Sequence, residues 1–314
     1  MDQRLTPPHY QAAGSSIPGL DALLRAFGLV RYRFFLYAGL LPYLLGAAWA
    51  YRVAHHVDAG VFWTGLLGIG LSVVGVEAFN EYFDSKMGTD RVFDPRDLPP
   101  MSDAVFWLGV AGFAGAAAIG LYLAVQGGWP VATFAALGGL AAVFYVGPPI
   151  RWAYRGLGEL MIALSYGPWM TLGSLYLLAH RLTWDAVLAS LVPGLLIMAL
   201  AVANGIPDFH QDRLVGKRNL VVRLGRRRAV FLYLTLAAAA LVVLAAGVAA
   251  DVFPLASLAG LLAVPLLAAS ARTALRTYET PRHFVTAIQG VVVAYLVAVT
   301  LFTLGVVLTE WVGA

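Results

Sequence analysis

The chain contains no cysteine and few charged residues. Asp, Glu, Lys and Arg make up only 12% of its 314 residues, about half the share found in ordinary soluble domains. The missing cysteines exclude disulfides and thiolate-bound metal sites. The scarcity of charge, together with a hydrophobic content of 60%, argues against a soluble domain and indicates a protein that resides in a membrane.

The apolar runs also lack the strict alternation of hydrophobic and polar residues that a membrane β-barrel requires. Because lipid offers the backbone no hydrogen bonds, runs of about 20 apolar residues must then be helices. We predict an all-α fold, a polytopic bundle of nine transmembrane helices. The predicted spans are residues 32–52, 61–82, 103–125, 130–149, 157–179, 186–206, 228–250, 253–274 and 284–309.

One domain accounts for residues 26–314, and the turn at residues 251–254 separates its seventh and eighth spans. We expect residues 1–25 to form a flexible or interfacial segment, because they lack the charged n-region, hydrophobic core and cleavage pattern of a secretory signal peptide. Ser102 or Asp103 is the expected N-cap of the third span.

Basic residues are distributed unevenly over the predicted loops. All 21 Lys and Arg residues except Arg52 and Arg181 fall on the side of the N-terminus. By the positive-inside rule that side is cytoplasmic, and an odd number of spans then places the C-terminus outside. The expected membrane is a plasma membrane of bacterial or archaeal type. Topology therefore explains the net charge of +4, and we expect neither a nucleic-acid partner nor an obligate protein partner.

Two polar boxes interrupt the hydrophobic sequence. Asn80 and Asp84 end the second span, while Asn204, Asp208 and Asp212 end the sixth. An even number of crossings separates the boxes, so both face the cytoplasm and can converge on one site. Residues four apart share one helical face, which predicts that each box forms a ladder along a continuous helix.

The side chains of both boxes offer only oxygen ligands. Carboxylates and amides without His or Cys suit Mg²⁺, Ca²⁺ or Mn²⁺ and not zinc. Mg²⁺ commonly uses one or two carboxylates together with substrate phosphates, so a diphosphate bridged by Mg²⁺ is the predicted guest. The candidate metal ligands are Asn80, Asp84, Asp90, Asn204, Asp208 and Asp212.

Several basic residues follow the boxes closely. They are positioned to neutralise phosphate oxygens or to stabilise a departing diphosphate; the alternative is that they anchor the helices at the lipid headgroups. These residues are Lys86, Arg91, Arg213, Lys217 and Arg218.

The motifs resemble those of the UbiA superfamily of intramembrane prenyltransferases. The first signature is similar to the naphthoate, or menaquinone-pathway, branch, with Asn80, Tyr82, Asp84, Gly88 and Asp90. The second runs from Asp208 through Asp212, Arg213, Gly216 and Lys217 to Gly225. A third segment, from Tyr145 through Arg151 and Arg155 to Glu159, resembles the loop after the family's fourth span.

The resemblance implies a mechanism. Mg²⁺ held by both boxes binds a polyprenyl diphosphate, whose ionisation gives an allylic cation that a small aromatic acceptor attacks. Asp84, Asp208, Asp212 and Lys217 would be catalytic, and Asn80, Asn204, Tyr145, Arg151 and Arg155 would join the basic residues in binding substrate. The apolar bundle would house the isoprenoid in contact with membrane lipid. Aromatic side chains would stabilise the cation, the candidates being Tyr82, Phe83, Tyr145, Tyr166 and Trp169.

The first box departs from the family pattern. Glu81 stands where many members have Asp, and Asp90 follows Asp84 by six residues. Neither Glu77, Glu81 nor the segment from Asp94 to Pro100 receives a role.

Dihydroxynaphthoate is the favoured acceptor, in the synthesis of a lipid quinone. Hydroxybenzoate, homogentisate, a glyceryl phosphate lipid and a chlorophyllide remain open. A different class of function, an ion-coupled secondary transporter, would place its carboxylates near the bilayer midplane and not beside phosphate-binding cations.

Overall fold

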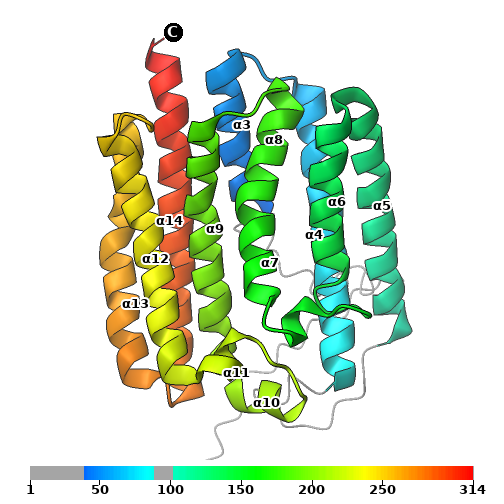
Figure 1. Ribbon diagram of the computed structural model, residues 1–314, viewed down its shortest axis with the longest axis vertical. Coiled ribbons are helices and arrows are strands. Elements are labelled where there is room, and N and C mark those ends of the chain that lie inside the picture. The colour runs from blue at the N-terminus through cyan, green and yellow to red at the C-terminus, as the bar shows by residue number, and fades with distance from the viewer. Residues whose placement is uncertain (1–38, 88–101, 314) are drawn as a thin grey trace, which may run out of the picture.

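The computed structural model describes residues 39–87 and 102–313, and all regular structure in these ranges is helical (Figure 1). The predicted segment 1–25, Asp90, Arg91 and the segment from Asp94 to Pro100 lie outside the described residues. The helices are α3 (Leu41–Ala54), α4 (Ala59–Met87), α5 (Asp103–Gly127), α6 (Trp129–Val143), η3 (Trp152–Tyr154), α7 (Gly158–Leu164), η4 (Ser165–Trp169), α8 (Met170–Ala179), α9 (Trp184–Gly205), α10 (Phe209–Leu214), α11 (Leu220–Leu224), α12 (Arg226–Ala249), η5 (Leu255–Ala263), α13 (Val264–Thr277) and α14 (Pro281–Gly313).

Apart from η3, α10 and α11, these helices overlap the predicted spans. Within the described residues, six are long and apolar enough to cross a membrane, namely α4, α5, α9, α12, η5 with α13, and α14. The remaining predicted spans correspond to α3, to the shorter apolar helix α6, and to the segment α7–η4–α8. The protein is thus a helical, multi-pass membrane bundle, while the count of nine crossings remains a prediction.

Local signals at the helix ends agree with the sequence. Ser102 is the N-cap of α5, and its side chain accepts a hydrogen bond from the Ala104 backbone N–H. The turn at residues 251–254 separates α12 from η5 as predicted, with Asp251 at a φ of 56°. The predicted cap and the predicted break between the seventh and eighth spans are therefore confirmed.

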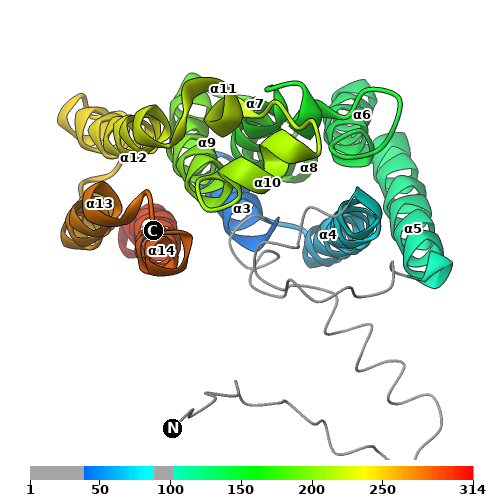
Figure 2. The ribbon, with the colours of Figure 1, turned by 90° about the horizontal axis from the view of Figure 1, so that it is seen from below.

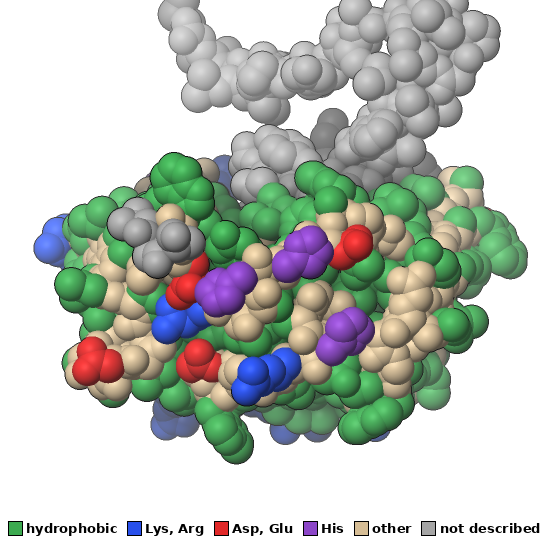
Figure 3. Space-filling view, turned by 90° about the horizontal axis from the view of Figure 1, so that it is seen from above, with side chains coloured by type: hydrophobic (Ala, Val, Ile, Leu, Met, Phe, Trp, Pro, Cys, Tyr) green, Lys and Arg blue, Asp and Glu red, His purple; other side chains and the backbone are tan. Residues whose placement is uncertain are grey.

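The loops gather at two ends of the bundle. Figure 1 shows α10, α11 and the α6–α7 and α13–α14 connections at one end, with the C-terminus at the other. The C-terminal end, seen in Figure 3, carries exposed histidines among apolar side chains. The two predicted outer arginines also belong to this end, because Arg52 lies in the last turn of α3 and Arg181 follows the end of α8 by two residues. Which end faces the cytoplasm stays a prediction.

The two halves of the bundle are packed differently. The main hydrophobic core joins α3, α9, α12, η5, α13 and α14 around large buried side chains such as Trp49, Tyr233 and Phe302. Helices α4, α5 and α6 lie beside this half in Figure 2. Residues from them and from α7, η4 and α8 line a large cavity. The half around α9, α12 and α14 is thus a tightly packed core, and the half around α4, α5 and α6 borders the cavity.

A π-helical turn interrupts the fifth span at η4, where Pro168 lies inside the helix. Proline has no backbone N–H to donate, and π-turns frequently mark functional sites. Close contact with α9 fixes the turn, because a Cβ added to Gly167 would lie 2.6 Å from the Gly194 Cα atom. Tyr166 and Trp169 line the cavity from this turn.

Candidate active site

The first box lies on α4, which continues to Met87. The helix carries Asn80 and Asp84 one turn apart, and both side chains line a cavity of about 1030 Å³. The predicted helical spacing of this box is therefore confirmed. The Oδ1 atom of Asn80 is buried and accepts no hydrogen bond from the described residues, so it remains available to a bound ligand.

The second box is not a continuous helical ladder, and that prediction is wrong. Helix α9 ends at Gly205, and α10 begins only at Phe209. Pro207 lies between them, where it offers no N–H to continue the helical hydrogen bonds. Despite the break, Asn204, Asp208 and Asp212 all line a second cavity of about 150 Å³.

Lys217 joins the two boxes. Its Nζ atom lies 3.6 Å from Oδ1 of Asp84 and 3.4 Å from Oδ1 of Asp212. Lys217 lines both cavities, and its side chain is only 14% exposed. Carboxyl groups that are 128 residues apart in sequence (212 − 84) thus share one ammonium group.

Burial and charge shift the pKa values of this group. Burial lowers the pKa of Lys217, but the carboxylates of Asp84 and Asp212 more than offset it, so that the pKa lies above its usual range. Burial raises the pKa of the Asp212 carboxyl, with partial compensation from Lys217 and Asn219. The neighbouring carboxylates thus favour the charged form of Lys217.

The backbone after α10 turns Lys217 toward the carboxylates. Gly216 has a φ of 79°, a conformation that glycine adopts without steric cost. The Lys217 N–H donates to the Asp212 carbonyl at 2.8 Å, and the Arg218 N–H donates to the Tyr154 carbonyl at 3.2 Å. The second box is thereby attached to the loop that precedes α7.

Asn219 is a functional candidate that sequence reasoning missed. Its Nδ2 donates to Oδ2 of Asp212 at 2.6 Å, while its Oδ1 accepts from the Val222 N–H at 2.8 Å and caps α11. The signal was an Asn directly before a short apolar helix, which is a common N-cap pattern. The cap and the carboxylate are coupled through one buried amide.

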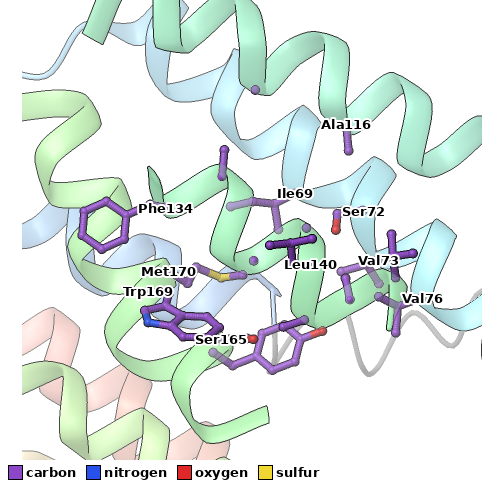
Figure 4. A pocket seen from close by; sticks show the side chains of 18 of the residues that line it. Ile69, Ser72, Val73, Val76, Ala116, Phe134, Leu140, Ser165, Trp169 and Met170 are labelled. Atoms are coloured by element: carbon purple, nitrogen blue, oxygen red, sulfur yellow. The ribbon is translucent and has the colours of Figure 1, made fainter. Parts of the chain in front are cut away.

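The large cavity has apolar walls between α4, α5, α6 and the fifth span. Ile69, Val73, Val76 and Leu140 surround it in Figure 4, with Trp169 and Met170 on another side. Of the predicted aromatic candidates, Tyr145, Tyr166 and Trp169 line this space. The other two do not. Phe83 and Tyr82 contact the Phe106 ring, with centroids 6.5 and 5.2 Å away.

The other predicted basic residues that the structure describes lie outside the cavity linings. Lys86 pairs with Asp103 at 3.3 Å and contacts Tyr82. Arg155 donates to the Pro149 carbonyl at 3.3 Å, and the Arg151 guanidinium lies 5.7 Å from the centre of the Tyr154 ring. Arg213 and Arg218 are exposed.

Negative charge dominates the lining of the two cavities. Among the described residues, Lys217 is the single Lys or Arg there, while five carboxyl side chains line them: Glu77, Asp84, Glu159, Asp208 and Asp212. A diphosphate would be repelled by this set unless cations bridged the charges. Within residues 39–87 and 102–313, no three His, Asp or Glu side chains cluster closely enough to hold a metal alone. The donor atoms that line the cavities are carboxylate and amide oxygens, the types that Mg²⁺ prefers.

Comparison with known proteins identifies relatives of this architecture. The model of the UbiA prenyltransferase family matches residues 39–291. The chain is 33% identical over 224 residues to the 1,4-dihydroxy-2-naphthoate octaprenyltransferase of Mycobacterium tuberculosis, covering 67% of this chain and 74% of that protein. It is 36% identical over 184 residues to the Escherichia coli protein of the same name, covering 57% and 58%. The second match thus spans less than two thirds of its relative.

Solved structures share the fold at low identity. A UbiA homologue from Aeropyrum pernix K1, in the apo state, aligns with a TM-score of 0.60 and 18% identity over 89% of this chain and 98% of that one. A homologue from Archaeoglobus fulgidus, bound to DMAPP and Mg²⁺, aligns with a TM-score of 0.56 and 14% identity over 88% and 99%. These likenesses establish the arrangement of the helices.

Proposed function

The chain belongs to the UbiA prenyltransferase family, and from this premise we propose that it transfers a polyprenyl group from a polyprenyl diphosphate to an aromatic acceptor in the membrane. The observation that carries the proposal is the convergence of Asp84 and Asp212 on Lys217. This cluster lies where an apolar cavity and a small acidic cavity meet, because Asn204 and Lys217 line both. The apolar cavity suits the hydrocarbon tail of a prenyl diphosphate, and the polar cluster with bound cations suits its diphosphate.

The residues present fit divalent cations. Asn80 and Asp84 would hold Mg²⁺ from the first box, and Asn204, Asp208 and Asp212 from the second. The buried Asn80 Oδ1, which accepts no hydrogen bond from the described residues, supports this assignment. When bound, Mg²⁺ supplies positive charge that stabilises the leaving diphosphate.

The proposed reaction breaks the bond between C1 of the prenyl group and the diphosphate oxygen, and the diphosphate leaves with the electron pair. A ring carbon of the acceptor supplies the electron pair for the new bond to C1. The ring then recovers an electron pair by losing H⁺ from that carbon, or CO₂ where the carbon carries a carboxylate. Lys217 would stabilise the charge that develops on the diphosphate, because it is a buried cation held in place before the reaction.

The large cavity would protect the allylic cation from water. Its described lining is mainly aliphatic and aromatic, and its volume of about 1030 Å³ leaves room for an isoprenoid chain. Tyr145, Tyr166 and Trp169 would face the cation, at on the order of 0.5–2 kcal/mol for each favourable contact. Excluding water in this way prevents hydrolysis of the reactive intermediate.

Dihydroxynaphthoate is the acceptor that we favour, in the synthesis of a menaquinone-type lipid. The names of the relatives support this choice. Hydroxybenzoate, homogentisate, a glyceryl phosphate lipid and a chlorophyllide are the alternatives to test. Ion-coupled transport is disfavoured, because the acidic cluster lies at the α10–α11 end of the bundle and not halfway along it.

The test uses purified full-length protein, Mg²⁺, a polyprenyl diphosphate and a panel of these acceptors. We expect release of diphosphate and a prenylated product with dihydroxynaphthoate. Asp84→Ala and Asp208→Ala should each abolish both signals. Turnover near that of the parent in both variants would refute the site, and product with a different acceptor would change the proposed substrate without changing the reaction.

A further inference from the structure

Glu159 is a buried acidic residue that the proposed reaction does not yet use. It lies in the first turn of α7 and is only 5% exposed. It lines the small cavity together with Asn204, Asp208 and Asp212. Helix α7, which belongs to neither box, therefore contributes a carboxyl group to the cavity beside the second box.

The two oxygens of Glu159 have different surroundings. Oε1 accepts a hydrogen bond from the Leu220 N–H at 3.0 Å, which joins α7 to the first residue of α11. Oε2 is buried and has no hydrogen-bond partner among the described residues. A buried carboxylate oxygen without a partner destabilises the folded protein, because it has lost its hydrogen bonds to water and gained none in return. A purely structural contact would require only Oε1.

The small cavity supplies space for the missing partner. Its volume of about 150 Å³ exceeds that needed for one ordered water. Lys217 is already within 4 Å of two other carboxylates. Mg²⁺ dehydrates reluctantly and keeps several water ligands, which donate strong hydrogen bonds to neighbouring carboxylates.

We propose that Glu159 is a positioning residue of the cation site at the second box, whose Oε2 accepts a hydrogen bond from a water ligand of the ion. The proposal rests on the proposed function, because it assumes that Asp208 and Asp212 hold a divalent cation. Through Oε1 the same side chain holds the backbone that follows Lys217. Cation binding and the position of the Lys217 loop are thereby coupled.

Glu159→Gln separates the two roles. The amide oxygen still accepts from Leu220, while the negative charge and the second acceptor are lost. Glu279→Gln is the matched control, since it removes one exposed carboxyl group outside the cavities. Asp208→Asn is the reference for loss of the metal site itself. Free Mn²⁺ is measured by electron paramagnetic resonance with detergent-solubilised full-length protein in the absence of diphosphate, which would itself chelate the ion. Thermal unfolding is followed with and without Mn²⁺.

We expect Glu159→Gln to weaken Mn²⁺ binding about tenfold or more. Without metal its Tm should equal or exceed that of the parent, because a buried carboxyl group close to Asp212 is neutralised. Mn²⁺ should then raise its Tm less than it raises that of the parent. Glu279→Gln should match the parent in both measurements.

Two results would overturn the role of Glu159. One is Mn²⁺ affinity equal to that of the parent while Asp208→Asn binds weakly, in which case the cation site stands without Glu159. The other is a Glu159→Gln protein that is destabilised equally with and without Mn²⁺, or that does not fold, which would show that the carboxylate stabilises the fold independently of any cation. Unchanged Mn²⁺ affinity in Asp208→Asn would instead refute the cation site of the proposed function.

Discussion

The Nζ atom of Lys217 lies 3.6 Å from Oδ1 of Asp84, although the two residues belong to different polar boxes. Asp212 adds a second carboxylate at 3.4 Å. Lys217 thus offsets part of the mutual repulsion of the two boxes. It also provides the one described Lys or Arg side chain in the cavity linings that could meet a departing diphosphate.

Replacing Lys217 by Gln should lower kcat/KM for the prenyl diphosphate by about 10²–10³, the usual loss when one preorganised electrostatic group is removed. Release of diphosphate measures the effect. Lys86→Gln is the control, because Lys86 is exposed and pairs with Asp103 outside the cavities; its turnover should stay within about threefold of the parent. Equal losses in the two variants would contradict the distinction drawn between these lysines.

Asn219 combines a helix cap with a contact to Asp212, and substitution can separate these roles. Asn219→Asp retains an acceptor for the Val222 N–H but removes the donor to Asp212 and adds a second carboxyl group. We expect its Tm in Mg²⁺ to stay closer to that of the parent than the Tm of Asn219→Ala, which loses a cap worth about 1 kcal/mol. Activity should fall in both variants. An Asp variant with full activity would show that the Asp212 contact is dispensable.

Arg223 connects the loop before α7 to the loop before α11 through two hydrogen bonds. Its Nε donates to the Arg218 carbonyl at 2.7 Å, and its Nη2 donates to the Arg155 carbonyl at 2.7 Å. Arg223→Gln removes this fork, so amide hydrogen exchange should rise at residues 152–156 and 217–222. Exchange in the middle of α12 should not change, because that helix packs in the main core. Unaltered exchange in both loops would exclude this role.

The sequence predicted those features that depend on local pattern. Asn80 and Asp84 lie on one helix because α4 is uninterrupted around them. Ser102 caps α5 because its hydroxyl reaches a backbone N–H two residues on. The prediction of a helical ladder from Asn204 to Asp212 was wrong because it assumed helical spacing across Pro207. Helix α9 ends at Gly205, before this proline.

The remaining parts of the site depend on contacts between distant segments. Glu159 meets Leu220 across 61 residues, and spacing along one helix carries no information about such a pair. Asn219 was recognisable as a cap, but its contact with Asp212 follows from the turn at Gly216. Lys217 was singled out for its closeness in sequence to the second box, whereas its approach to Asp84 required the folded bundle.

The central claim is that both boxes serve one cation-dependent diphosphate site, and the Mg²⁺ dependence of diphosphate release tests it most directly. Asp84→Asn and Asp208→Asn each remove one carboxylate with little change in volume, one from each side of the site. We predict that each variant loses turnover at Mg²⁺ levels that saturate the parent, and that any residual activity requires higher Mg²⁺. Turnover and Mg²⁺ dependence equal to those of the parent in either variant would contradict the account.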